Sequence, residues 1–181
     1  MRIKIFVLLC LTAIMQFTGV TPLKASHYYY KQLSLKDGVT SAVRCILTDK
    51  QGFVWIGTKA GISRYDGHEL KKYVHSPNNP HSIPNNLIHQ IAEDEMSNIW
   101  ILTDKGIARY QRQSDDFFLP TDEKGNPIIA YSTCLTKDGV LFGSKDKVYF
   151  YSYRDSSLRL LQKLNKGNNF NISLLSLWNE H

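Results

Sequence analysis

The sequence repeats itself at an offset of 45 residues, and this feature constrains the fold more than any other. Residues 49–65 and 94–110 align without a gap and share eight identities in seventeen positions. The identical pairs are Asp49 and Asp94, Trp55 and Trp100, Ile56 and Ile101, Thr58 and Thr103, Gly61 and Gly106, Ile62 and Ile107, Arg64 and Arg109, and Tyr65 and Tyr110. The chain is therefore expected to build its core from similar, successive units.

A weaker third copy follows the second at a further offset of 41 residues. In LTKDGVLFGSKDKVYFYS, Gly143 falls under Gly57 and Tyr151 falls under Tyr65, but the tryptophan and most glycines are missing. The segment NISLLSLWNEH, residues 171–181, resembles the beginning of the earlier copies. It predicts the start of a fourth unit.

Local patterns within the first copy predict four short strands. SAVRCILT alternates apolar and polar residues, FVWIGT is a continuous apolar run, ISRY follows the corner at Gly61, and HELKKYVH is polar and basic, as suits an outer edge. Asp66 and Gly67 are expected to supply the positive φ angles of a tight hairpin turn before this last strand. HSPNNPHSIPNN, rich in Pro and Asn, reads as the loop to the next unit.

Four short antiparallel strands that recur every ~40 to 45 residues are typical of a β-propeller blade, because each small sheet has two apolar faces that neighbouring blades cover. The predicted fold class is therefore all-β. The expected division places blade 1 at residues 41–85, blade 2 at 86–128, blade 3 at 129–170 and the start of blade 4 at 171–181, after an N-terminal segment at 26–40. In a full ring, that segment would form the outer strand of the closing blade.

Residues 1–25 have the pattern of an export signal: basic Arg2 and Lys4, an apolar run from Ile5 to Phe17, and a small residue, Ala25, at the expected cleavage site. The run is shorter than the ~20 residues that a membrane helix needs, so a retained anchor is the less favoured interpretation. Residues 26–181 would form about three and a half blades, whereas closed propellers use ~4 to 8. We therefore expect an incomplete propeller, the N-terminal part of a longer protein, rather than a closed four-bladed ring.

Charge and cysteine content limit the function classes. Loss of the signal lowers the formal charge from +6 to +3, and the remaining basic residues are interspersed with acids, which argues against nucleic acid as a partner. Cys45 and Cys134 fall in different units and are expected to be two buried thiols rather than a disulfide.

The stretch from Asp49 to Gly67 resembles the two-component regulator propeller repeat, whose typical form reads D..G..WIGT..GL.RYDG. Eleven residues match this pattern: Asp49, Gly52, Trp55, Ile56, Gly57, Thr58, Gly61, Arg64, Tyr65, Asp66 and Gly67. The second copy departs from it at Ser97, at Leu102 and at Gln111-Arg112, which weakens the turns expected there.

The resemblance implies the periplasmic sensor region of a hybrid two-component regulator, tethered to the inner membrane in the full-length protein. In such proteins two propellers precede a sandwich module, a membrane helix and a histidine kinase. The partners implied are an oligosaccharide ligand, the remaining blades and domains, and a second copy in a dimer. No cofactor or metal is implied, and this chain has no nucleotide-binding motif of its own.

Several individual residues have two interpretations. Trp55 and Trp100 could stack on sugars, but their place in apolar strands favours packing between blades. Arg64 and Arg109 could face an anionic ligand, although surface or interblade ion pairs are more common at such positions. The acidic runs 93–95 and 115–116 are expected to satisfy backbone amides at turns.

Two chemical interpretations complete the analysis. The histidines show no metal-ligand spacing, the closest pair being His75 and His81. The spacing Asp49-x-x-Gly52-x-x-Trp55 also resembles the Asp-box of sialidase propellers, which keeps a secreted glycoside hydrolase or lyase as an alternative. Because no activated nucleophile is recognisable, a non-enzymatic binding role is preferred.

Overall fold

The computed structural model describes residues 41–163, which lie in the compact unit Leu33–His181. Within these residues the chain forms twelve strands and no helix, so the all-β class is confirmed. No described helix is long and apolar enough to cross a membrane. The expected signal at 1–25, the N-terminal segment at 26–40 and the start of a fourth blade at 171–181 lie outside the described residues.

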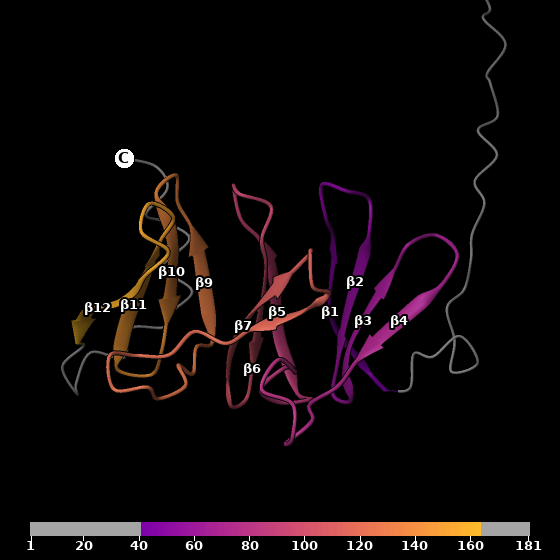
Figure 1. Cartoon of the computed structure of the whole chain (residues 1–181), viewed down its shortest axis with the longest axis horizontal. Coiled ribbons are helices and arrows are strands. Elements are labelled where there is room, and N and C mark those ends of the chain that lie inside the picture. Colours follow the sequence, from indigo (N-terminus) through magenta and orange to yellow (C-terminus); the bar gives the residue numbers. More distant parts are fainter. Residues whose placement is uncertain (1–40, 164–181) are drawn as a thin grey trace, which may run out of the picture. The chain divides into compact units, whose positions relative to one another are not determined.

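The strands form three antiparallel four-stranded sheets, each made from consecutive strands (Figure 1). Sheet 1 contains β1 (Val43–Thr48), β2 (Val54–Thr58), β3 (Gly61–Tyr65) and β4 (Leu70–Tyr73). Sheet 2 contains β5 (Ile88–Glu93), β6 (Ile99–Thr103), β7 (Gly106–Gln111) and β8 (Asp116–Phe118). Sheet 3 contains β9 (Ser132–Leu135), β10 (Gly139–Gly143), β11 (Lys147–Ser152) and β12 (Leu158–Lys163). This is the strand order of propeller blades.

The β2–β3 and β6–β7 hairpins turn in the same way because a threonine at the equivalent position ends the first strand of each hairpin. The Thr58 hydroxyl donates to the Gly61 carbonyl at 2.9 Å, and the Thr103 hydroxyl donates to the Gly106 carbonyl at 2.7 Å. Gly61 has a φ of 113°, and a Cβ there would lie 2.5 Å from the Tyr73 carbonyl oxygen. Glycine is therefore required at this corner by both its backbone conformation and its neighbour.

The β3–β4 turn differs from the expected pair of positive φ angles. Gly67 has a φ of 99°, but Asp66 is not among the residues with positive φ. Instead the Asp66 carboxylate accepts hydrogen bonds from the backbone amides of His68 and Glu69, at 2.8 and 2.7 Å. Asp66 thus closes the turn with its side chain, and only Gly67 supplies the left-handed backbone.

The departures in the second copy preserve the shape of one turn and extend the other hairpin by one residue pair, since Tyr65 pairs with Leu70 directly before its turn, whereas Tyr110 pairs with Phe117 and Gln111 then pairs with Asp116. Ser97 adopts a φ of 60°, close to the 88° of Gly52 at the equivalent position, so the β5–β6 turn keeps its shape. The β7–β8 turn spans four residues between the paired Gln111 and Asp116, and it has its positive φ, 56°, at Asp115. The weakening expected at Ser97 is therefore wrong, because serine tolerates this backbone here.

Sheet 2 is buried on both faces. Ile99, Ile101, Ala108 and Tyr110 join Trp55, Ile62 and Tyr73 of sheet 1 in one core cluster. Trp100, Leu102 and Ile107 join Val140, Phe142, Tyr149 and Tyr151 of sheet 3 in another. Alternate residues of β6 therefore serve opposite cores, as the period of a strand requires. We call the contact between sheets 1 and 2 the first interface and that between sheets 2 and 3 the second interface.

A close approach at the first interface explains one signature glycine. A Cβ on Gly57 would lie 2.5 Å from the Cys45 sulfur and 2.8 Å from Cγ2 of Ile88 in sheet 2. At the equivalent position of sheet 2, Leu102 is fully buried in the core facing sheet 3. At the second interface the leucine side chain fills the space between the sheets, whereas at the first interface the strands lie too close to leave room for a side chain at this position.

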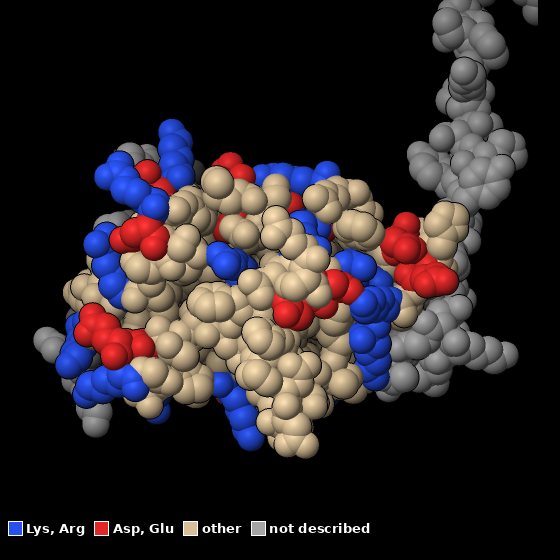
Figure 2. Space-filling view, viewed as in Figure 1, with Lys and Arg blue, Asp and Glu red and all other residues tan. Residues whose placement is uncertain are grey.

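The two described cysteines are unpaired and lie in different sheets, as expected. Cys134 is buried in β9, whereas Cys45 in β1 is only partly buried. Burial raises the pKa of both thiols, which leaves them protonated and weakly reactive near neutral pH. Basic and acidic side chains are interspersed over the face shown in Figure 2.

Candidate functional site

The polar residues of the repeat gather at the two interfaces, beginning with the aspartates that follow β1 and β5. One Asp49 oxygen accepts the backbone amides of Gln51 and Phe53 at 3.0 and 2.9 Å, and the other accepts the indole N–H of Trp55 at 2.9 Å. Asp49 therefore closes its turn and fixes the orientation of the buried tryptophan six residues later.

Asp94 repeats this arrangement in sheet 2. It accepts the amides of Met96 and Asn98 at 2.9 and 2.8 Å and the indole N–H of Trp100 at 2.7 Å. The expectation that this acidic run satisfies backbone amides is confirmed for Asp94.

Both tryptophans pack between sheets, as their positions in apolar strands predict. Trp55 meets Tyr110 of sheet 2 edge-on, with centroids 4.8 Å apart and an interplanar angle of 66°. Trp100 meets Tyr151 of sheet 3 at 4.8 Å and 65°. Both indoles are fully buried. They are interface residues of the core rather than platforms open to a ligand.

The arginines of the repeat reach across the same interfaces. Arg64 donates to the hydroxyl of Tyr110, and Arg109 donates to the hydroxyl of Tyr151 at 2.6 Å. Each guanidinium also lies over the ring of its own sheet's tryptophan, 5.9 Å away for Arg64 and 6.0 Å for Arg109. The ion pair between blades that was predicted for these arginines is confirmed for Arg64, which pairs with Asp115. Arg109 contacts the next blade through the Tyr151 hydroxyl instead.

Arg64 belongs to a polar cluster around Asp115, the left-handed residue of the β7–β8 turn. One carboxylate oxygen accepts from Arg64 at 3.2 Å, from the Tyr73 hydroxyl at 2.6 Å and from the Tyr110 hydroxyl. Lys71 donates to the other oxygen. Three of these donors come from sheet 1 and one from sheet 2, so Asp115 joins the sheets. The expectation that Asp115 serves backbone amides is wrong, because side chains occupy both of its oxygens.

The environment of Asp115 shifts the pKa values of the groups involved. Burial alone would raise the pKa of Asp115, but hydrogen bonds from Lys71, Tyr110 and Tyr73, with the nearby charge of Arg64, lower it to about 2. Burial and the hydrogen bond to this carboxylate raise the pKa of both tyrosines. The cluster therefore holds a carboxylate and two neutral phenols throughout the physiological pH range.

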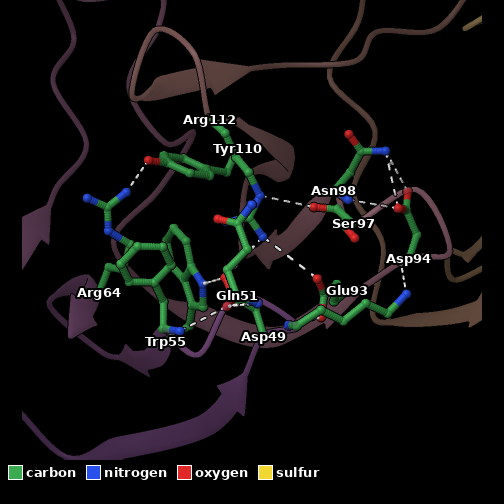
Figure 3. Close-up of polar contacts among 12 residues, drawn as sticks. Asp49, Gln51, Trp55, Arg64, Glu93, Asp94, Ser97, Asn98, Tyr110 and Arg112 are labelled. Carbon is green, nitrogen blue, oxygen red and sulfur yellow. Dashed lines mark hydrogen bonds and ion pairs between the residues drawn. The ribbon is translucent and has the colours of Figure 1, made fainter. Parts of the chain in front are cut away.

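Arg112 forms a second connection at the first interface, on the side of the turns that follow β1 and β5 (Figure 3). Its guanidinium donates to Asp49 at 3.0 Å and to the Gln51 side chain at 2.8 Å, both in sheet 1. It also donates to the Ser97 carbonyl at 3.2 Å and lies 3.7 Å from Glu93, both in sheet 2. One side chain thus connects the turns of two sheets.

The carboxylates beside Arg112 are shielded from solvent. The Asp49 side chain is fully buried and that of Glu93 is 7% exposed. Burial alone would raise the pKa of Asp49, but hydrogen bonds from Trp55, Arg112 and Phe53 lower it. Both Asp49 oxygens are occupied by structural donors, which argues against a catalytic role for this Asp-box-like residue.

Both arginines have aromatic neighbours, but among the described residues Arg109 at the second interface lacks the carboxylate that Arg64 has in Asp115. Its guanidinium lies 5.1 Å from the Phe118 ring and 5.6 Å from that of Tyr151. Phe118 pairs with Arg109 across the sheet, as Lys71 pairs with Arg64 in sheet 1. Within residues 41–163, no carboxylate forms an ion pair with Arg109.

Three of the described histidines have polar partners at separate places. His75 contacts the Ile83 carbonyl through Nδ1 at 2.8 Å, His81 lies 3.5 Å from Asp116, and His89 lies 3.4 Å from Asp104. No group of three or more metal-ligating side chains occurs in the described part of the chain.

A pocket of about 360 Å³ lies between the loop after β8 and the outer strands of sheet 3. Its lining residues are Asp122, Glu123, Lys124, Asn126, Tyr149, Leu158, Leu160 and Lys163. Asp122 closes a further turn of the Asp49 type, since its carboxylate accepts the amides of Lys124 and Asn126 at 2.9 and 2.8 Å. This turn lies outside the 45-residue spacing, so comparison of the repeats did not reveal it.

The signature residues chosen from the sequence divide into two groups. Asp49, Trp55, Gly57 and Tyr110 lie at the first interface, whereas Trp100, with the Asp94 that binds its indole, lies at the second. Gly143 lies in β10 of sheet 3. Gly52, Thr58, Gly61, Tyr65, Asp66, Gly67, Thr103 and Gly106 lie in turns and strand ends. Sequence comparison missed Asp115 and Arg112, although the departure at Gln111-Arg112 pointed to this turn.

Comparison with known proteins finds a family model and a curated relative that each match part of the chain. Residues 37–60 match the family model described as the two component regulator propeller. This segment is therefore similar to a propeller repeat of two-component regulators. In addition, 59 residues are 37% identical to Histidine kinase P4 of Formosa agariphila, a match that covers 32% of this chain and 4% of that protein.

Solved structures share the propeller fold. The extracellular domain of BT3049 from B. thetaiotaomicron, assigned to a hybrid two component system, is 20% identical with a TM-score of 0.59, over 76% of this chain and 20% of that one. The extracellular domain of BT4673, assigned to a one component system of the same organism, is 19% identical with a TM-score of 0.58, over 77% and 22%. The chain thus spans about a fifth of these structures, and its three sheets are blades of a propeller.

Proposed function

We propose that this chain is part of the exported sensor propeller of a two-component regulator and that the sensor detects oligosaccharides in the periplasm. The observation that carries this proposal is the two-component regulator propeller match at residues 37–60, which lies at the start of blade 1. The fold shared with two extracellular domains supports export. The output resides in a kinase elsewhere in the full-length protein, and a dimer of that protein transmits the signal.

Blades packed through buried aromatic interfaces suit a binding role. A ligand changes the output only by binding more tightly to one of two arrangements of the propeller and its attached domains. A scaffold of this kind positions loops and rim side chains without contributing a reactive group, and the carboxylates that join blades 1 and 2 are occupied by structural donors. An enzymatic role as a glycoside hydrolase or lyase is therefore not favoured.

The binding role is tested by titrating the purified chain with a panel of neutral and acidic oligosaccharides in a calorimeter. We expect at least one saccharide to bind and to be recovered unchanged. New reducing ends or unsaturated products after incubation would support the enzyme instead. The absence of binding across the panel would contradict detection by this segment.

Export is tested separately by fusing residues 1–25 to alkaline phosphatase that lacks its own leader. Activity in intact cells is expected, because this enzyme matures only after export. Deletion of the apolar run 5–17 serves as the control and should abolish the activity. An inactive fusion would contradict the periplasmic location.

A further inference from the structure

The two interfaces place equivalent arginines beside different groups, and this difference points to a ligand. The β7–β8 and β11–β12 turns have the same length, since Gln111 pairs with Asp116 and the Ser152 amide bonds the Ser157 carbonyl at 2.9 Å. The fourth and last residue of each turn has positive φ: 56° at Asp115 and 51° at Ser156. Ser156 therefore stands where blade 2 has the carboxylate that binds Arg64.

The other components of the arginine site are shared by the two interfaces. Arg64 and Arg109 both donate to the tyrosine hydroxyl of the next blade, and both lie over their own blade's tryptophan. At the first interface the hydroxyl of Tyr110 in turn donates a hydrogen bond to the Asp115 carboxylate. The molecule itself thus shows which chemical group this arginine–tyrosine pair accepts: a carboxylate.

The second interface also differs on the outer strand. Phe118 takes the place of Lys71, its side chain is 40% exposed, and its ring lies beside the Arg109 guanidinium. An exposed aromatic face next to a cation suits a ligand with both an apolar face and a negative charge. A sugar acid has both features, since the ring carbons present an apolar face and the carboxylate lies at its edge.

We propose that Arg109 and the Tyr151 hydroxyl bind the carboxylate of an acidic sugar, which packs against Phe118. The carboxylate site follows from the comparison of the two interfaces, whereas the choice of a sugar rests on the function proposed above. At the first interface the carboxylate of Asp115, in the β7–β8 turn, occupies the position that the ligand's carboxylate would take at the second interface.

The first experiment supplies the carboxylate by mutation and needs no ligand. Ser156→Asp places an aspartate at a φ that Asp115 already tolerates, and Ser157→Asp adds the same charge one residue away. Both serines are exposed. We expect Ser156→Asp to raise the melting temperature by about 2–4 °C relative to the unmodified chain, but not when Arg109→Gln is also present, because a charge-assisted hydrogen bond forms with Arg109. A melting temperature of Ser156→Asp no higher than that of the unmodified chain, or an equal rise in the Arg109→Gln background, would overturn the site.

The second experiment adds glucuronate, with glucose as its neutral match, to the full chain and follows thermal stability. Glucuronate but not glucose should stabilise the protein, and Arg109→Gln and Ser156→Asp should each weaken the effect about tenfold or more in ligand concentration. Ser157→Asp should keep it. Failure of glucuronate to stabilise the unmodified chain would contradict the sugar acid as ligand.

The outcomes separate this inference from the proposed function. Neutral oligosaccharides that bind equally well to Arg109→Gln and to the unmodified chain would support the sensor and contradict the carboxylate site as its ligand site. Conversely, stabilisation by Ser156→Asp and by glucuronate, in a chain that binds none of the oligosaccharides, would support the site and contradict oligosaccharide sensing.

Discussion

The first and second interfaces share an aromatic frame but are completed in different ways. Each has a tryptophan and a tyrosine with centroids 4.8 Å apart and an arginine that donates to the same tyrosine. At the first interface, Asp115 and Arg112 add charged contacts between the blades. At the second, the residues between 41 and 163 give Arg109 aromatic rings and a tyrosine hydroxyl but no carboxylate. A single repeat can therefore produce one interface joined by ion pairs and another in which the equivalent arginine contacts aromatic side chains.

Replacing either tryptophan with alanine should have the largest effect and should test whether the frames are equivalent. Trp55→Ala and Trp100→Ala each remove a fully buried ring and the indole donor of a buried aspartate. We expect each to lower the free energy of unfolding by about 3–5 kcal/mol, measured by urea denaturation. Unchanged stability with lost ligand binding would show that the indole contacts a ligand instead.

Removing Arg112 should affect the first interface alone. Arg112→Met leaves the buried carboxylates of Asp49 and Glu93 without their shared cation, which should cost about 2–3 kcal/mol in urea denaturation. Arg154, exposed in the corresponding turn of blade 3, provides the matched control, and Arg154→Met should change stability by less than about 0.5 kcal/mol. Similar losses in the two variants would mean that Arg112 does not join the blades.

Adding a methyl group at Gly57 tests the close approach found only at the first interface. Gly57→Ala should cost about 1–3 kcal/mol, because the new Cβ would meet the Cys45 sulfur and the Ile88 side chain. Cys45→Ala removes the nearer obstacle, so the double variant should recover part of the loss in the same denaturation assay. Strictly additive losses would show that the sulfur is not the obstacle.

The smallest expected effect is the pH dependence of the Asp115 cluster. Because the folded pKa of Asp115 is about 2 and the unfolded value is near 3.9, its contribution is complete above about pH 4 and is lost as the pH falls toward 2. Partial exposure limits the contribution to about 1–2 kcal/mol. The stability difference between the unmodified chain and Asp115→Asn should therefore shrink over this window.

The corresponding change at the second interface is the control for this pH effect. Ser156→Asn replaces a residue that has no carboxylate, so its stability difference from the unmodified chain should stay constant between pH 4 and 2. Denaturation curves at several pH values measure both variants. A difference for Asp115→Asn that does not vary with pH would contradict the salt-bridged cluster.

The sheets could be predicted from sequence because burial in a strand follows a local, two-residue period. The repeat of Trp55 and Trp100, each six residues after an aspartate, was enough to predict two equivalent buried interfaces. The left-handed backbone at Ser97 was not anticipated, since glycine is the usual residue there and serine occupies it under the constraint of the same turn.

The polar contacts between blades could not be predicted in the same way. The alignment of the two copies ends at Tyr110. The outer strand of the second copy begins two residues later than the 45-residue offset predicts, because Lys71 and Phe118 occupy the same register position. Where Asp115 and Arg112 reach depends on the shape of that turn and on the neighbouring sheet. A linear comparison contains neither, so Asp115 appeared as an ordinary turn acid and Arg112 as a departure.

The burial of every residue in β6 has a consequence for how this gene can change. Ile99 and Ile101 serve one core while Trp100 and Leu102 serve the other. Insertion or deletion of a single codon within this strand would exchange the two sets and disturb both cores at once. The hairpin turns already differ in length between blades, since Thr58 pairs with Gly61 across the β2–β3 turn, whereas Gly143 pairs with Val148 across the β10–β11 turn. Length variation among related genes should therefore accumulate at the rim and avoid the middle of the central blade.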